Sequence, residues 1–390
     1  MDEDAQAIGA RLREIREARG KSLAVIAGLA GITEAYLSML ETGKRALNRR
    51  SLIVALANAL EVSPSDLFDL GTSPLPAEPA TEAAIGAVRD AMQAVDVGEP
   101  GGQVQPVEQL AVRAETALST AQAMRLAEAG AMLPDLIRDL HTSIDAGHDV
   151  ADLLRWCAVL YPQAVESWLF GVSAPVDLCW LAARAGRDAA RRLDEPVALG
   201  VAAFGLSNYL LTRGSFDLAG RALPPRDTGD DQLDGMLSLT RCLVATSDSR
   251  PGDVEAPLEM AAELAARTGD GNAHWMSFGP SNVALWRVSV ALESGDHERA
   301  AQLSDEVHPT ALPPRRRVNH YTNRARALSQ IRPRREDAVL ALRSAEKISP
   351  DSVRRSPGAR RLLGELVTRT RDEALGRELR GMAYRAGLAV

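Results

Sequence analysis

The sequence has few of the residues that build disulfide frameworks, metal sites or membrane spans. Aromatic residues make up 4% of the 390 residues, and the three cysteines, Cys157, Cys179 and Cys242, lie far apart in the chain. Their odd number and wide spacing argue against a disulfide framework or a metal site. We therefore expect the three cysteines to be small residues of the hydrophobic core. No apolar run approaches the roughly 20 residues that a membrane span needs.

Motifs of catalysis are absent as well. The chain has no phosphate-binding loop, no Gly-x-Ser-x-Gly nucleophile elbow and no His-Glu-x-x-His zinc motif. Its six histidines are scattered, and no pair has the i, i+4 spacing of metal ligands on a helix. We therefore expect a protein that is not an enzyme and that uses no metal or cofactor. The acidic start of the chain lacks the pattern of a signal peptide, so we expect a cytoplasmic protein.

The residues that are present favour an all-α protein of two main parts. Hydrophobic residues, mostly Ala, Leu and Val, make up 46% of the chain and charged residues 25%, a balance typical of helix-rich globular proteins. No segment alternates with a period of two, so we predict no sheet. The three prolines of "GTSPLPAEP" mark a linker after a compact unit of five predicted helices. The expected domains are 1–70, a linker with one helix over 71–106, and a long helical region over 107–390.

The long helical region contains a repeated pattern of helix, small-residue turn and second helix. Its turns fall near residues 214, 250, 295 and 332, about 40 residues apart, whereas tetratricopeptide repeats have a period of about 34. The pattern resembles a degenerate, long-helix version of that family. Such a resemblance implies a curved solenoid in which the first helix of each pair lines a concave face.

The strongest local pattern is "SLAVIAGLAGITEAYLSMLETGKR". Ala27 is small enough for a second helix to cross close to the first. Gly31, four residues later, suits the positive φ of a sharp interhelical turn. Thr33 is the expected N-cap of the second helix, and Leu37 and Leu40 have the spacing to pack it against the first. Together these positions predict a helix-turn-helix unit.

This unit resembles the lambda-repressor/Cro-like, or XRE, family of helix-turn-helix DNA-binding domains over residues 8–70. The resemblance implies that the second helix lies in the major groove. Its residues expected at base edges or the nearest phosphates are Thr33, Glu34, Ala35, Tyr36, Ser38 and Met39. The residues expected to hold the DNA backbone are Lys44, Arg45, Asn48, Arg49 and Arg50. Residues 33–50 carry four basic and two acidic side chains, a local charge of +2 in a chain of −7, as phosphate attraction requires.

Three positions of this unit need separate interpretation. Many family members have Gln where this chain has Leu23, which puts a phosphate contact from that position in doubt. Glu34 has two open interpretations, a contact to a cytosine amino group or a charge that stabilises the helix N-terminus. Glu41 is expected to be structural, paired with the backbone or with an arginine.

A second candidate site is "WMSFGPSNVALWRV", residues 275–288. Gly279-Pro280 suits the start of a helix, and Asn282, Trp286, Ser289 and Glu293 share one stripe of that helix. Two interpretations are open: ordinary packing, or one wall of a ligand- or peptide-binding surface. The candidate binding residues are Asn208, Trp275, Phe278, Asn282, Trp286, Arg317, His320, Tyr321 and Arg324.

The motif "FGPSNVALWRV…SGDHERA" also resembles a signature of actinobacterial XRE regulators that carry a tetratricopeptide-like C-terminal region, and this resemblance favours a two-part architecture over most of the chain. The resemblance implies a cytoplasmic, nucleoid-associated homodimer that binds a DNA operator, because one helix-turn-helix unit reads only half a site. We expect a transcription regulator whose helical region senses a peptide or a small molecule. The alternative is an adaptor whose repeats bind a protein partner and whose N-terminal domain localises it to DNA.

Overall fold

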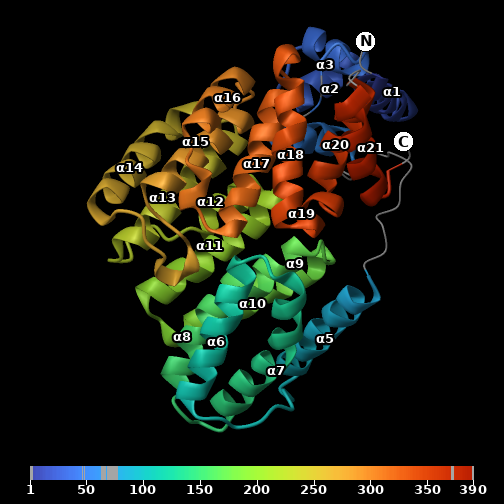
Figure 1. Ribbon diagram of the computed structural model, residues 1–390. Coiled ribbons are helices and arrows are strands. Elements are labelled where there is room, and N and C mark those ends of the chain that lie inside the picture. The colour runs from blue at the N-terminus through green and yellow to red at the C-terminus, as the bar shows by residue number, and fades with distance from the viewer. Residues whose placement is uncertain are drawn as a thin grey trace.

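A computed structural model describes residues 3–45, 47, 49–62, 67, 78–369 and 373–388 of the chain. Every regular element among these residues is a helix, so the prediction of an all-α protein is confirmed for this part of the chain (Figure 1). The helices form an N-terminal domain, a bundle of helices α5 to α10, and a series of helix pairs that begins with α11.

The N-terminal domain holds four helices among its described residues: α1 (Glu3–Ala18), α2 (Leu23–Leu29), α3 (Glu34–Glu41) and α4 (Arg50–Leu60). Its core is formed by leucines and isoleucines from all four, including Leu12, Ile26, Leu37 and Leu56. The fifth helix, predicted after residue 62, lies outside the described residues except for Leu67, which is buried in the same core.

The bundle contains the helices between the N-terminal domain and the helix pairs: α5 (Pro79–Asp96), α6 (Val107–Gln122), α7 (Leu126–Asp145), α8 (Val150–Leu160), the π-helical turn η2 (Tyr161–Glu166), α9 (Ser167–Gly171) and α10 (Val176–Leu193). Helix α5 was predicted as part of the linker, but it packs along α7 and buries Ile85, Val88 and Met92 in the core of the bundle. The bundle therefore begins at α5. Residues 71–77 of the predicted linker lie outside the described residues.

Four helix pairs follow the bundle: α11 (Pro196–Thr212) with α12 (Phe216–Ala222), α13 (Asp231–Ser247) with α14 (Glu255–Thr268), α15 (Pro280–Glu293) with α16 (His297–Glu306), and α17 (Pro314–Ser329) with α18 (Arg335–Ile348). Short 3-10 turns connect several of them: η3 (Pro251–Asp253), η4 (Ala273–Trp275), η5 (Pro309–Ala311) and η6 (Arg332–Arg334). All four predicted turns lie within these pairs. Gly214 and Gly295 have φ values of 73° and 82°, which a glycine adopts without strain.

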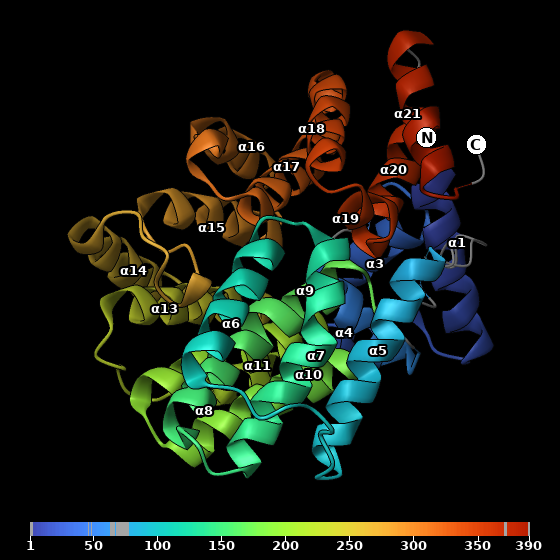
Figure 2. The same cartoon turned by 60° about the horizontal axis from the view of Figure 1, so that its bottom comes forward.

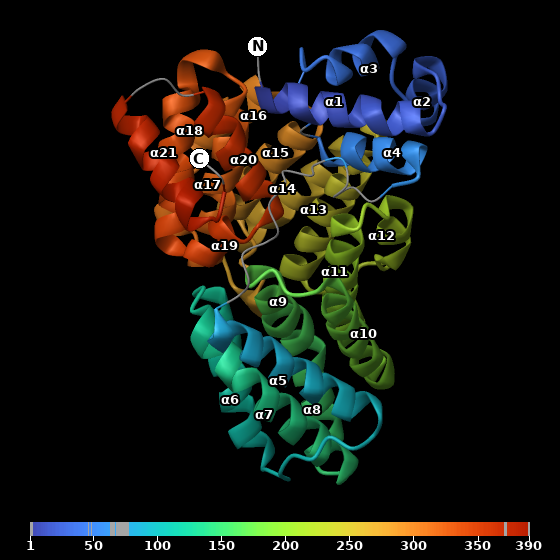
Figure 3. The ribbon, with the colours of Figure 1, turned by 90° about the vertical axis from the view of Figure 1, so that its right-hand side faces the viewer.

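The last helices, α19 (Pro350–Arg354), α20 (Pro357–Arg369) and α21 (Glu373–Arg385), return to the N-terminal domain. Helix α20 packs beside α1, and Figure 3 shows the N-terminal domain in blue above α12 and α13 and next to α20. In the view of Figure 2 the bundle lies at the bottom, and α18 and α21 lie at the top.

Two properties of the described residues bear on the sequence-based expectations. Cys157, Cys179 and Cys242 are free and buried, and burial raises the pKa of Cys157 and Cys179 to about 12. No single helix in the described part of the chain is long and apolar enough to cross a membrane. Only α2 and α3 taken together reach that length and composition, and they are bent by 106°.

The segment before α15 is fixed by one close packing contact. The Phe278 side chain is fully buried, and its ring lies where a side chain at Gly235 of α13 would be. A Cβ atom at Gly235 would lie 2.0 Å from Cζ of Phe278 and 2.5 Å from its Cε2. Glycine at this position therefore lets the ring of Phe278 lie directly on the backbone of α13.

Replacing this glycine tests the packing. We expect Gly235→Ala to lower the free energy of unfolding by about 1–3 kcal/mol, because the buried ring has no open space into which to move. The measurement is urea unfolding followed by circular dichroism. Gly86→Ala in α5 is the control, because a Cβ there meets nothing within 4 Å, and it should raise stability by about 0.5–1 kcal/mol. A Gly235→Ala protein as stable as the wild type would contradict the contact.

Candidate functional site

The α2–turn–α3 unit has the geometry of a helix-turn-helix. Its helices are bent by 106° relative to each other, within the usual range for this motif. Gly31 in the turn has a φ of 68°. The hydroxyls of Ser22 and Thr33 cap the two helices by accepting hydrogen bonds of 3.2 Å from the amides of Val25 and Tyr36. The predicted roles of Gly31 and Thr33 in this turn are confirmed.

A buried ion pair fixes the end of α3 against α1. Nε and Nη2 of Arg16 donate to the two carboxylate oxygens of Glu41 at 2.6 and 2.9 Å, and Nη1 donates to the carbonyl of Lys21 at 3.0 Å. The hydrogen bond to Glu41 raises the pKa of Arg16. Because bidentate pairs fix orientation, this contact holds α3 at one angle to the rest of the domain. The expected structural role of Glu41 agrees with this contact.

The residues predicted to contact bases differ in exposure. Thr33, Glu34 and Ala35 are exposed at the start of α3. Tyr36, Ser38 and Met39 are half-buried. Lys44 and Arg45 are exposed just after α3, so the outer face of the helix is bordered by two cations. This face is available to a partner of negative charge.

Arg49 was predicted to hold the DNA backbone, but its side chain faces the helix pairs. Its Nε donates to the carbonyl oxygen of Glu293 at 3.2 Å, and its Cδ lies 3.1 Å from the position of a Cβ at Gly295. The sequence does not show this contact, because proximity in the chain to Lys44 and Arg45 does not fix the direction of a side chain. The contact of Arg49 with the DNA backbone stays a prediction. Asn48 and the side chain of Arg50 lie outside the described residues.

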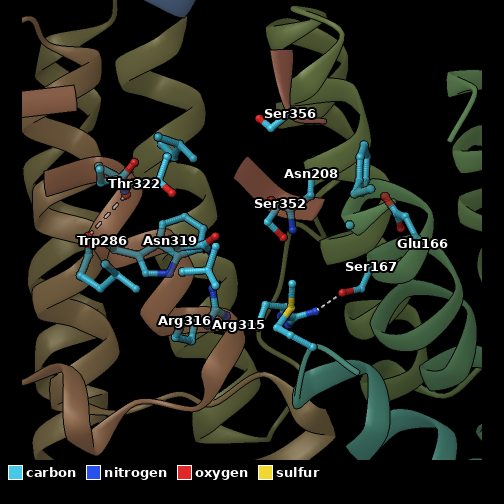
Figure 4. Close-up of a pocket in the computed structure, with 18 of the residues that line it drawn as sticks. Glu166, Ser167, Asn208, Trp286, Arg315, Arg316, Asn319, Thr322, Ser352 and Ser356 are labelled. Carbon is cyan, nitrogen blue, oxygen red and sulfur yellow. Dashed lines mark hydrogen bonds between the residues drawn. The ribbon is translucent and has the colours of Figure 1, made fainter. Parts of the chain in front are cut away.

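A second feature is a cavity of about 470 Å³ between the bundle and the helix pairs (Figure 4). The first helix of each of the four pairs contributes to its wall. Its other walls come from η2, α9 and α19. The polar and charged residues that line it are Gln163, Glu166, Ser167, Ser173, Asn208, Ser247, Ser289, Glu293, Arg315, Arg316, Asn319, Thr322, Asn323, Arg326, Ser352 and Ser356.

Part of the predicted binding surface lies in this cavity. Asn208 and Trp286 line it, together with Ser289 and Glu293 of the predicted stripe on α15. Ser289 accepts a hydrogen bond from Nδ2 of Asn323 at 2.9 Å. Oε1 of Glu293 pairs with Arg326 at 3.2 Å, while Oε2 has no partner.

The predicted residues of α17 do not line this cavity. Arg324 pairs with Asp305 outside the cavity, and neither Arg317 nor Tyr321 lines the cavity. His320 is buried with its ring against Tyr321, and burial lowers its pKa to about 4. The residues of α17 that line the cavity are different from those predicted from the sequence. Polar side chains occur on both faces of α17, so the pattern of its sequence does not show which face points inward.

Three residues of the 275–288 segment also lie outside the cavity. Trp275 packs on Trp156, with ring centroids 6.0 Å apart. Phe278 is part of the core against Gly235. Asn282 is buried, with Nδ2 3.1 Å from Sδ of Met236. The contacts of Phe278 agree with the interpretation as ordinary packing, whereas Trp275 is half-buried and lines a second, separate pocket with Trp156.

The start of α15 is also not free for a ligand. The carboxylate of Asp270 accepts hydrogen bonds from the amide of Ser281 at 3.1 Å and from its hydroxyl at 2.8 Å. The anion that the helix N-terminus attracts is therefore supplied by the chain itself.

Sequence reasoning missed the charged residues at the centre of the cavity. Glu166 is 2% exposed, and neither of its carboxylate oxygens has a hydrogen-bond partner. Burial raises its pKa well above the usual range, although the charge of Arg315 acts in the opposite direction. Burial and the charge of Arg315 lower the pKa of Arg316 to about 9. The sequence does contain one sign of this site: Pro162 and the polar residues Gln163 and Glu166 interrupt a mainly apolar segment.

The described residues hold no group of three or more His, Cys, Asp or Glu side chains placed to bind a metal ion. The chemistry of the cavity is therefore that of arginine guanidinium groups, two carboxylates, amides and hydroxyls. Such a lining can bind a small polar molecule through ion pairs and hydrogen bonds.

Comparison with known proteins identifies the N-terminal domain. Residues 7–70 match the family model of a helix-turn-helix domain. No curated protein and no solved structure matches the chain. The chain therefore has a helix-turn-helix domain, which implies DNA binding, followed by an all-helical region.

Proposed function

We propose that the protein is a transcription regulator whose helical region binds a small effector in the central cavity and passes the signal to the helix-turn-helix domain. The family match and the exposed face of α3 support DNA binding. We also propose a lambda-repressor-like mode of reading DNA as a homodimer, because one unit reads half of a site. The four turns and the first helices in the cavity wall support a tetratricopeptide-like arrangement of the helix pairs.

The observation that carries the proposal is the position of Glu293. Its side chain lines the cavity and pairs with Arg326, while its backbone carbonyl accepts the hydrogen bond from Arg49. One residue thus contacts both the cavity and the DNA-binding domain. A ligand that competes for Arg326 changes the environment at the end of α15.

A second contact joins the helix pairs to α4, the helix of the DNA-binding domain that follows Arg49. A Cβ at Gly214, in the turn after α11, would lie 2.5 Å from both methyl carbons of Val54 in α4. Helix α11 lines the cavity through Asn208 and Gly205. Helix α4 and its N-cap residue Arg49 therefore rest on the turns that end two cavity-lining helices. An effector that binds one arrangement of these helices better than another shifts the orientation of α4.

The assignment of the DNA-contacting cations can be tested on a DNA site selected by the wild-type protein from a random library. We expect Lys44→Ala with Arg45→Ala to weaken binding and to lower the slope of log affinity against log salt by about 2, one for each lost phosphate contact. Binding is measured by fluorescence anisotropy over a salt series.

Arg125→Ala with Arg191→Ala is the matched control, because it removes two exposed cations from the bundle and should leave the slope unchanged. An equal loss of affinity in both double variants would mean that only net charge matters. An unchanged affinity after loss of Lys44 and Arg45 would contradict the proposed DNA surface.

The link between cavity and DNA can be tested without knowing the effector. Arg326→Gln removes the partner of Glu293 in the cavity, and Arg49→Ala removes the contact to its carbonyl. We expect the two changes to be non-additive in the free energy of DNA binding, with a coupling of about 0.5–2 kcal/mol.

The control cycle pairs Arg49→Ala with Arg191→Gln, on the exposed face of α10, and should be additive. Additive effects of Arg326→Gln and Arg49→Ala would show that the signal does not pass through Glu293.

A further inference from the structure

We propose that the cavity binds a small molecule that carries a protonated amine, and that the amine pairs with the carboxylate of Glu166. This inference rests on the proposed function, since it names the ligand class of the effector cavity. Its test measures ligand binding without DNA, so its failure can be told apart from a failure of the DNA-binding proposal.

Glu166 differs from the other buried acids of the described chain. Glu41 is paired with Arg16, Asp139 with Arg113 and two backbone or amide donors, and Glu346 with two arginines. Both oxygens of Glu166 are buried without a partner. A buried carboxylate without a partner is costly to the fold. Its retention in a cavity wall fits a partner that comes from outside the chain.

Each cation of the cavity has at least one partner within the protein, although Nε of Arg316 has none. Arg315, whose charge acts on Glu166, donates to the hydroxyl of Ser167 at 2.5 Å and to Oε1 of Gln163 at 3.4 Å. Arg316 donates to the carbonyl of Met276 at 2.8 Å, and Arg326 pairs with Glu293. Figure 4 shows the contact between Arg315 and Ser167, with Glu166 beyond it on the opposite wall from Trp286. None of these arginines donates a hydrogen bond to Glu166, so its buried carboxylate keeps both oxygens without a partner in the chain.

The backbone around Glu166 is shaped to hold this carboxylate. Glu166 ends the π-helical turn η2, and π-helical turns are frequent at functional sites. Gly205 of α11 lies opposite: a Cβ there would be 2.5 Å from Cβ of Pro162 and 3.0 Å from Oε2 of Glu166. Glycine at 205 thus leaves space for both the proline and the carboxylate.

The apolar lining suits an amine as well. Phe170, Phe204 and Trp286 line the same cavity, and aromatic faces attract ammonium groups. A cavity of about 470 Å³ lies within the usual size for small-molecule sites, roughly 300–1,000 Å³. An arylalkyl amine combines both properties and is a suitable probe.

The experiment compares benzylamine with benzyl alcohol, which has a similar shape but no positive charge at neutral pH. Binding is measured by isothermal titration calorimetry with the full-length protein. We expect benzylamine to bind the wild type about ten-fold or more tightly than benzyl alcohol, as a charged hydrogen bond in a buried site predicts. In Glu166→Gln the two compounds should bind alike.

Glu115→Gln, on the exposed face of α6, is the matched control and should behave as the wild type. Thermal melting verifies that Glu166→Gln is folded. Equal binding of the two compounds to the wild type, no binding of benzylamine at millimolar concentration, or a preference for the amine that persists in Glu166→Gln would each overturn the proposal.

A second readout uses the wild-type protein alone. The titratable groups that act on Glu166 from neighbouring helices are Arg315 of α17, Cys179 of α10 and Tyr209 of α11. Burial raises the pKa values of the thiol and the phenol, so both are uncharged at neutral pH. Burial also raises the pKa of Glu166, which favours its protonated form in the empty cavity.

An ammonium group favours the carboxylate, so its binding releases a proton from the protein. We expect the affinity for benzylamine to rise from pH 6 to pH 8, with heats that depend on the ionisation enthalpy of the buffer. An affinity that stays constant or falls over this range would contradict a pairing with Glu166.

Two probes separate the sources of such an amine. L-Phenylalanine and 2-phenylethylamine differ by one carboxylate, which Arg315 would bind in exchange for its contacts with Ser167 and Gln163. Tighter binding of the amino acid, lost in Arg315→Met, would identify an amino-acid-like ligand, and tighter binding of 2-phenylethylamine a simple amine. Both outcomes keep the ammonium at Glu166, whereas equally tight binding of N-acetyl-L-phenylalanine would overturn it.

Discussion

The hydrogen bond from Arg49 to the carbonyl of Glu293 connects the two functional parts of the molecule. Arg49 is the N-cap residue of α4, and Glu293 is the last residue of α15. The contact is supported by the packing of Arg49 on Gly295 and of Val54 on Gly214. Both turns can lie close to α4 because glycine has no side chain and adopts the positive φ of these positions without strain. Helices α11 and α15 extend from these turns to the cavity wall, and through them we propose that a change at the cavity reaches α4.

The cavity combines features that cost stability in an ordinary protein core. Glu166 is a buried acid without a partner, Glu293 keeps one free oxygen, and three arginines lie along the same wall. Buried groups of this kind are retained where a ligand completes their interactions. The buried pair of Arg16 and Glu41 has both partners within the chain and serves a different purpose, since it fixes the orientation of α3.

The sequence was sufficient to predict features set by local physics, and insufficient for those set by distant packing. Gly31 and Thr33 could be assigned because a turn and a cap depend on a few adjacent residues. The turns at Gly214 and Gly295 and the inward stripe of Trp286, Ser289 and Glu293 followed from the same reasoning. The direction of Arg49, the inward face of α17 and the isolation of Glu166 depend on helices far away in the chain, which no local pattern reports. Phe278 was ambiguous, because a buried ring and a ligand-binding ring have the same sequence pattern.

We propose that a ligand in the cavity changes the DNA-binding domain through α4. Hydrogen–deuterium exchange with and without saturating benzylamine measures this coupling. We expect altered protection of amides in α4 (Arg50–Leu60) in addition to those of η2 and α17, and the loss of the α4 change in Arg49→Ala. A change confined to the cavity helices in the wild-type protein, with α4 unaffected, would contradict it.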